Sequence, residues 1–464
     1  MAETYQLTGS LSDSRSGLSE AWVDRRAYVR TAILAYFFLL NFLLISRNLE
    51  ELIEFPFVMI FVVPYFFLTL KYPEMGLAIF VIFHLSPLKG LTAARTSFLS
   101  LSILIELCLV AALFLHFLVS RTLARFKDNL TFLFFVYIGF YIVAAVWRST
   151  ATAEREGGWL KSMVVFLLTY VVIVAFIDSW ERLTRFLRSI VLLSLFWFVA
   201  SFIDILKYGF APIYLRVRTN IGFLQKWTQV DILATTVLMF LPLLYFLLRQ
   251  KQSRPWHYLT LWAIVLSPIT VFLTASRNGF VTLIVVVALL FLKKKSSSLK
   301  WAFVMIMVVL ILVAPSGYRQ RISRITDLNV ESGLSLKISH FQRGLGIISQ
   351  NPLFGIGLGK LQRAIHNSVL QIAVDVGLPA MFLFLSLIYL AFTRLKKVGR
   401  LIRQSPSAAS FSELPAIVMI SLVAYLIGGL TVSNNLMLPF FMILGLITAV
   451  QNISLKETNA PEKR

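Results

Sequence analysis

Long apolar blocks dominate the pattern of hydrophobic and polar positions along the chain, and they are not arranged as amphipathic stripes. A helix needs about 20 apolar residues to cross a hydrocarbon core of about 30 Å, so blocks of this length predict transmembrane α-helices. The predicted spans are 31–46, 53–70, 75–87, 97–119, 130–147, 160–178, 188–206, 229–248, 257–274, 279–292, 301–314, 367–392, 414–432 and 436–453. The third and tenth spans are short enough to be half-spans or tilted segments.

Two connections between these spans, 207–228 and 315–365, are too long to be simple turns. Loops of such length inside a compact protein are usually functional. The second connection is amphipathic in part, since "GYRQRISRI" and "SLKISHFQRGLGII" mix basic and apolar residues as helices lying along a membrane surface do. Its basic residues fit either a solvated charged face or a basic floor for an anionic lipid headgroup.

The composition agrees with a membrane protein. The chain has 464 residues, of which 58% are hydrophobic and 14% charged, and its mean hydropathy is +0.80. Soluble globular proteins carry about 25% charged residues, so a cytosolic enzyme and a disordered chain are both excluded. We expect an all-α polytopic membrane protein with about 12–14 transmembrane helices and a long, partly helical extracytoplasmic loop.

The net charge of +22 would suggest nucleic-acid binding in a soluble chain. Here most Lys and Arg residues fall in short loops on one side of the predicted spans, as the positive-inside rule requires. This distribution predicts that both termini are cytoplasmic. No nucleic-acid-binding motif accompanies the basic residues, so we expect no nucleic-acid partner. The polar first 28 residues do not read as a cleavable signal peptide. The one cysteine, Cys108, lies inside an apolar block and by itself forms neither a disulfide nor a metal site.

The pattern divides the chain into four regions. We expect a cytoplasmic tail over 1–28, a first group of transmembrane helices over 29–206, a second membrane region over 207–454 that includes the loop 315–365, and a cytoplasmic tail over 455–464. The long loop has no counterpart in the first half of the chain, which disfavours a transporter built from two repeats.

The most informative motifs lie where the long loop re-enters the membrane. Residues 351–359 read "NPLFGIGLG", and residues 365–378 read "IHNSVLQIAVDVGL", which places His366 and Asn367 at a loop-to-helix junction. Together these motifs resemble the O-antigen ligase and polymerase family, bacterial membrane glycosyltransferases that move lipid-linked glycans onto acceptors. The resemblance is clearest over residues 216–392, and it implies that 207–454 is a ligase/polymerase-like catalytic membrane region.

The resemblance implies a donor glycan on undecaprenyl diphosphate, a glycan acceptor (a second lipid-linked glycan for a polymerase, lipid A-core for a ligase), and inversion at the anomeric carbon. It also implies a multi-pass protein of the bacterial inner membrane, surrounded by membrane lipids, with its active site facing outward. The motifs do not separate polymerase from ligase, although the long loop and the number of spans slightly favour a polymerase. The alternative from another class is a lipid-linked oligosaccharide flippase or exporter.

His366 is the candidate catalytic base. An imidazole accepts a proton near neutral pH, which is what a sugar hydroxyl needs before it attacks an anomeric carbon. The alternative is a structural hydrogen-bonding histidine at a helix start. Asn367 and Asp231 are candidate supporting or acceptor-binding residues, and Asp231 equally suits a helix cap.

Three arginines are candidate ligands of the diphosphate. Arg277, in "SRN", interrupts an apolar run and resembles the family's Ser-Arg motif, while Arg216 and Arg218 lie in "YLRVRTNIGF". The guanidinium fork fits phosphate oxygens in a bidentate way, and Arg277 would also offset charge on the leaving group. The alternatives are that Arg277 is an interfacial residue reaching to water, and that only one of Arg216 and Arg218 points into the site.

The remaining acids are assigned weaker roles. The chain has no Asp-x-Asp motif and no cluster with metal-ligand spacing, so we expect a metal-independent transfer without a cofactor. Glu106, inside a predicted span, is expected to pair with Arg95 or a serine hydroxyl more readily than to act in catalysis. Asp375 lies nine residues after His366, nearly opposite it on one helix at 100° per residue, so it is not expected to be its partner.

Overall fold

The computed structural model describes residues 55–85, 101–119, 125–147, 153–208, 230–274, 276–292, 305, 334–358, 360–361, 365–404, 406–431 and 438–458. Within these ranges every regular element is helical, which confirms the all-α class. The elements are α2 (Phe55–Lys71), α3 (Pro73–Leu85), α5 (Leu101–Val119), α6 (Asn129–Trp147), α7 (Ala153–Phe176), α8 (Trp180–Tyr208), α10 (Val230–Arg249), α11 (Arg254–Leu273), α12 (Arg277–Leu292), α15 (Leu334–Gln350), α16 (Ser368–Val376), α17 (Leu378–Gln404), the 3-10 turn η4 (Pro406–Phe411), α18 (Leu414–Thr431) and α19 (Leu438–Thr458).

Seven of the described helices are long and apolar enough to cross a membrane: α5, α8, α10, α11, α17, α18 (counted with the turn before it) and α19. Shorter apolar helices lie within α2, α3, α6, α7 and α12. In hydrocarbon a backbone can be satisfied only by its own helix or by a closed barrel, and the apolar blocks of this sequence fold accordingly. The predicted spans 31–46 and, apart from Met305, 301–314 lie outside the described residues.

The prediction of one span over 367–392 is wrong. The chain breaks at Gly377, whose φ of 103° lies where only glycine is comfortable. A Cβ on Gly377 would also sit 2.2 Å from the carbonyl oxygen of Leu353. The break separates α16, with nine residues, from the long helix α17. At about 1.5 Å per residue α16 is too short to span a bilayer.

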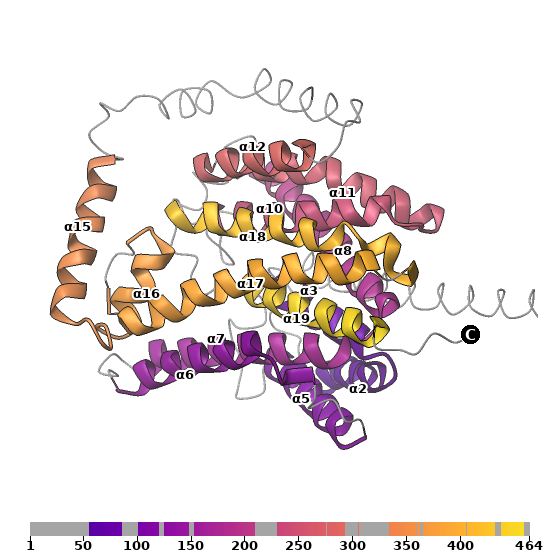
Figure 1. The fold of residues 1–464 in the computed structure, drawn as a ribbon, viewed down its shortest axis with the longest axis horizontal. Helices are drawn as coiled ribbons and strands as arrows, with labels where there is room; N and C mark the ends of the chain where they lie inside the picture. The colour runs from indigo at the N-terminus through magenta and orange to yellow at the C-terminus, as the bar shows by residue number, and fades with distance from the viewer. Residues whose placement is uncertain are drawn as a thin grey trace, which may run out of the picture.

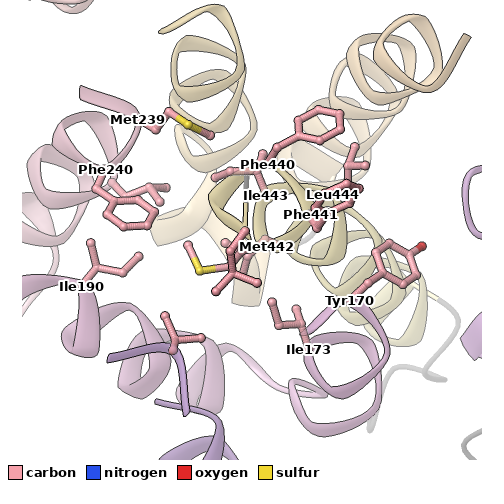
Figure 2. Packing of buried hydrophobic residues seen from close by; sticks show 14 of the residues in the cluster. Tyr170, Ile173, Ile190, Met239, Phe240, Phe440, Phe441, Met442, Ile443 and Leu444 are labelled. Carbon is pink, nitrogen blue, oxygen red and sulfur yellow. The ribbon is translucent and has the colours of Figure 1, made fainter. Parts of the chain in front are cut away.

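The core of the bundle lies around α19. Figure 2 shows the run from Phe440 to Leu444 surrounded by side chains of α7, α8 and α10, and this whole run is buried. The ring of Phe441 stacks on Phe166 with centroids 4.7 Å apart. Burying this many aromatic and aliphatic groups makes α19 the scaffold against which the other helices are held.

The long helices run side by side, and the two ends of the bundle differ (Figure 1). We call one the ion-pair end; it holds the α2–α3 turn, the starts of α6, α8 and α11, and the end of α17. We call the other the α15 end, where α15 crosses the bundle beside α16. There α15 packs on α16 through an apolar cluster that contains Ile348, Ile365 and Val374. The prediction that the long loop is partly helical is confirmed by α15.

Candidate functional site

The last turn of α18 joins the elements of the candidate site. Two adjacent glycines allow close packing there: a Cβ on Gly428 would lie 2.5 Å from the side chain of Thr235 on α10, and one on Gly429 would lie 3.0 Å from Ser368 Oγ on α16. The absence of side chains at 428 and 429 therefore lets α10 and α16 approach α18 from two sides.

Two asparagine amides complete this junction. Asn278 Nδ2 donates to the carbonyl of Gly428 at 3.1 Å, and Asn367 Nδ2 donates to the carbonyl of Leu430 at 3.4 Å. Two residues along a helix rise by about 3 Å, so both amides bind the same helical turn. Arg277 and His366, which directly precede these asparagines, are thereby brought to the same end of the bundle.

Arg277 is the first residue of α12 and is exposed. The preceding residue, Ser276, caps the helix because its Oγ accepts from the N–H of Gly279 at 2.9 Å. Among the residues that the structure describes, Arg277 forms no ion pair. A helix N-terminus already carries a partial positive charge, so this end of α12 offers two reinforcing contributions to binding an anion.

Asp231 lies in the first turn of α10 and faces the start of α12. The hydroxyl of Ser276 donates to Asp231 Oδ1, which ties the N-terminal ends of the two helices together. Of the two roles considered for Asp231, this contact supplies a structural one, because the same serine that caps α12 also holds the carboxylate.

His366 has an unusual backbone conformation. Its φ of 58° makes it the one non-glycine residue with positive φ in the described part of the chain. Such a conformation costs about 1–3 kcal/mol and persists only where the neighbours hold it. On one side the N–H of Ile365 donates to Gln371 Oε1 at 3.0 Å; on the other, Asn367 Oδ1 accepts from the N–H of Leu370 at 3.0 Å. The His366 side chain is exposed between these two fixed residues.

A second histidine, not selected from the sequence, lies beside His366. The ring of His340, on the buried face of α15, is 5.8 Å from the ring of His366, at 72° to it. The two residues are 26 positions apart in a loop whose fold the sequence does not specify. One sequence signal pointed to His340. Positions 340, 344 and 348 are spaced by four residues, so His340 shares one face of an amphipathic helix with Gly344 and Ile348.

Asp375 is buried on the last turn of α16. Gln371 Nε2 donates to both of its carboxylate oxygens at 2.9 Å, while the carbonyl of the same amide accepts from Ile365. Burial raises the pKa of Asp375 to about 7, although the hydrogen bonds from Gln371 act in the opposite direction. Asp375 is thus linked through Gln371 to Ile365, the residue before His366, and the expectation that Asp375 is not the direct partner of His366 stays a prediction.

Glu106 forms the kind of pair expected of an intramembrane acid. Its Oε1 accepts from Ser102 Oγ at 2.9 Å and lies 3.0 Å from His84 Nε2. The serine partner was predicted and the histidine was not; Arg95 lies outside the described residues. The pair joins α3 to α5 and is assigned no role at the candidate site.

Arg216 and Arg218 lie outside the described residues, so their relation to Arg277 and His366 stays a prediction. Within the ranges that the structure describes, no three His, Cys, Asp or Glu side chains are grouped as metal ligands would be. The described candidate residues thus form a cationic and imidazole-bearing junction of α10, α12, α16 and α18, bordered by α15.

Comparison with known families gives one match. Residues 262–385 match the model of a family described as O-antigen ligase. The matched segment includes Arg277, His366, Asn367 and Asp375, and it leaves out Asp231 and the two arginines of the 207–228 connection. No curated protein matches the chain.

Proposed function

We propose, from the premise that this chain carries an O-antigen ligase domain over residues 262–385, that it is a membrane glycosyltransferase of surface polysaccharide assembly. In this proposal the donor is a glycan on undecaprenyl diphosphate and the acceptor is a sugar hydroxyl, on a second lipid-linked glycan or on lipid A-core. The observation that carries the proposal is the last turn of α18, to which asparagines at the starts of α12 and α16 both donate hydrogen bonds.

Arg277 is assigned to the diphosphate. Its charge is exposed, has no ion-pair partner among the described residues and adds to the positive end of α12. As the glycosidic bond to phosphate breaks, negative charge grows on the leaving oxygen. A fixed guanidinium and the backbone N–H groups at the helix start would stabilise that charge without reorganisation. Arg216 and Arg218 are proposed to complete the phosphate site.

His366 is assigned to the acceptor. Its imidazole would take the proton from the attacking hydroxyl as the bond to the anomeric carbon forms. The proton passes to the imidazole, and the undecaprenyl diphosphate leaves as an anion held by arginine. Asn367 holds His366 by capping α16 and binding α18, and Asp231 supports Arg277 through Ser276. The step as written uses only groups of the chain, so it needs no metal.

The bundle is proposed to lie in the bacterial inner membrane with the α15 end outward. Basic residues are concentrated at the opposite end, where α8 and α11 begin and α10 ends (Figure 1), as the positive-inside rule favours for the cytoplasmic face. They include Arg182, Arg185, Arg249 and Arg254. The exposed apolar residues of α15, among them Ile338, Phe341 and Leu345, suit a helix lying at the lipid–water boundary.

Reconstitution tests the proposal. Purified protein in nanodiscs is mixed with lipid-linked oligosaccharide extracted from the source bacterium, with or without lipid A-core, and products are separated by gel and mass spectrometry. Longer lipid-linked chains indicate a polymerase, and glycan on lipid A-core indicates a ligase. Absence of any new glycosidic bond, together with movement of unaltered donor between the leaflets of sealed proteoliposomes, would instead indicate the flippase and reject the transferase.

A further inference from the structure

The backbone that carries His366 is held by residues that the chemistry so far has not used. Residue 366 is in a left-handed conformation, and the N–H immediately before it, on Ile365, is buried and bound to Gln371 Oε1. A side-chain amide can bind in either of two orientations, and only one presents its oxygen to Ile365. Whatever orients the amide of Gln371 therefore decides whether this contact exists.

The carboxylate of Asp375 orients that amide. Both of its oxygens lie 2.9 Å from Gln371 Nε2, and an ionised carboxylate only accepts hydrogen bonds. The NH2 group of Gln371 must then point toward Asp375 and its oxygen toward Ile365. The spacing of four residues on α16 places the two side chains on the same helical face.

We propose that Asp375 is a positioning residue for His366, acting through the Gln371 amide and the Ile365 N–H to hold the backbone from which the imidazole projects. The inference rests on the proposed function in taking His366 as the catalytic base. It assigns Asp375 no contact with substrate.

The state of charge of Asp375 then matters. With a pKa of about 7, Asp375 is mostly ionised above pH 7 and becomes protonated as the pH falls below 7. Among the groups around it, α6 presents the phenol of Tyr137, while the 351–357 loop and the first turns of α17 carry no charged residue. Phenols ionise near pH 10. On α15 the imidazole of His340 lies against His366, and it is the same in the wild type and in Asp375→Asn.

Protonation would turn one carboxylate oxygen of Asp375 from an acceptor into a donor. The hydrogen bonding that orients the Gln371 amide would then be weaker. Turnover at acid pH would then need two deprotonations, one at His366 and one at Asp375. The acid limb of a plot of log kcat against pH should be steeper by about one unit of slope in the wild-type protein than in Asp375→Asn, whose side chain does not ionise.

The experiment combines a structural and a kinetic readout on full-length protein in nanodiscs. Hydrogen exchange followed by mass spectrometry measures the Ile365 amide in the wild type, Asp375→Asn and Gln371→Leu. Asp178→Asn, at the ion-pair end, is the matched control. Both α16 variants should lose protection at Ile365, and the control should not. With lipid-linked oligosaccharide as donor, Asp375→Asn should lower kcat by about 10- to 100-fold, as a misplaced catalytic group does, while undecaprenyl diphosphate binds as before.

Unchanged exchange at Ile365 in Asp375→Asn would overturn the proposal, as would an acid limb of equal slope in the wild type and in Asp375→Asn. A fall in kcat that merely follows a lower unfolding midpoint, equal to that of a similarly destabilised control, would reduce Asp375 to a stability residue. Loss of protection at Ile365 in a protein that transfers no glycan at all would leave the positioning intact and reject the proposed function instead.

Discussion

The two ends of the bundle use the same kinds of residues in opposite ways. At the ion-pair end each of several arginines meets a carboxylate: Arg185 and Arg182 contact the buried Glu74, and Arg125 lies 3.3 Å from Asp178. At the α15 end, Arg277 is exposed and has no acid within ion-pair distance among the described residues, while the nearby carboxylate of Asp231 is occupied by Ser276.

The difference separates arginines that hold the fold from one that is available to a ligand. A paired guanidinium is neutralised by its partner, so its field does not reach a substrate. An exposed guanidinium at a helix start keeps its field and attracts anions. The variants below test whether the two ends differ in this way.

The largest effect is expected at His366. His366→Ala should lower turnover by about 10²- to 10⁴-fold, the range that general bases contribute, while donor affinity changes little because the histidine faces the acceptor. His366→Gln should recover little, since an amide does not accept a proton near pH 7. Turnover and binding of undecaprenyl diphosphate are measured in nanodiscs, with exposed His257 of the ion-pair end changed to Ala as control. Substantial turnover in His366→Gln would demote the residue from base to positioning group.

The next effect concerns the two kinds of arginine. Arg277→Lys keeps the charge but loses the bidentate fork, and we expect turnover to fall by about 100-fold, as for a lost charge-stabilising donor worth about 2.7–4 kcal/mol. Arg249 pairs with Glu413 at the ion-pair end. Arg249→Lys should leave turnover within about twofold, because exposed ion pairs contribute little. Equal effects in both variants would remove the distinction between the ends.

A stability effect is expected at the ion-pair end. Glu74→Gln removes a buried acid that Arg185 and Arg182 contact, and we expect it to lower the free energy of unfolding by about 1–3 kcal/mol, below the figure for fully buried pairs because both arginines are partly exposed. The unfolding midpoint in detergent is the measurement, and Glu413→Gln, at an exposed pair, is the control. A fall in donor binding without a lower midpoint would contradict the structural role.

No effect is expected from a chelator. Because the sequence has no Asp-x-Asp motif and the charge on the leaving group is assigned to arginines, transfer should proceed equally with and without EDTA. Activity that disappears with EDTA and returns with Mg²⁺ or Mn²⁺ would mean that a metal supplies the charge now assigned to Arg277.

Most of the helices could be predicted from the sequence because hydrophobic length is a local property. The spans expected at 229–248 and 414–432 agree closely with α10 (Val230–Arg249) and α18 (Leu414–Thr431). The break at Gly377 could not be predicted in this way, since the residues on both sides are equally apolar. It depends on a backbone angle and on contact with the Pro352–Leu353 turn.

The candidate site was predictable only in part for a similar reason. His366, Asn367 and Arg277 stand out because polar residues interrupt apolar runs, and the structure brings them to one end. The contact of His340 with His366 depends on how α15 folds back across the bundle, and the route from Asp375 through Gln371 to Ile365 ends on a backbone group, which no residue pattern reveals.

The turn at 351–357 has a consequence for inheritance and engineering. Its N–H groups bind the last carbonyls of α16, since Ile356 donates to Val374 at 2.8 Å and Gly357 to Asp375 at 3.0 Å, while Leu378 donates back to Pro352 at 2.8 Å. A deletion or insertion in either of the two segments would leave these backbone N–H and C=O groups without partners where the turn packs on the end of α16. Residues 351–378 should therefore pass between related proteins as one indivisible module, and a functional chimera must place its junctions outside them.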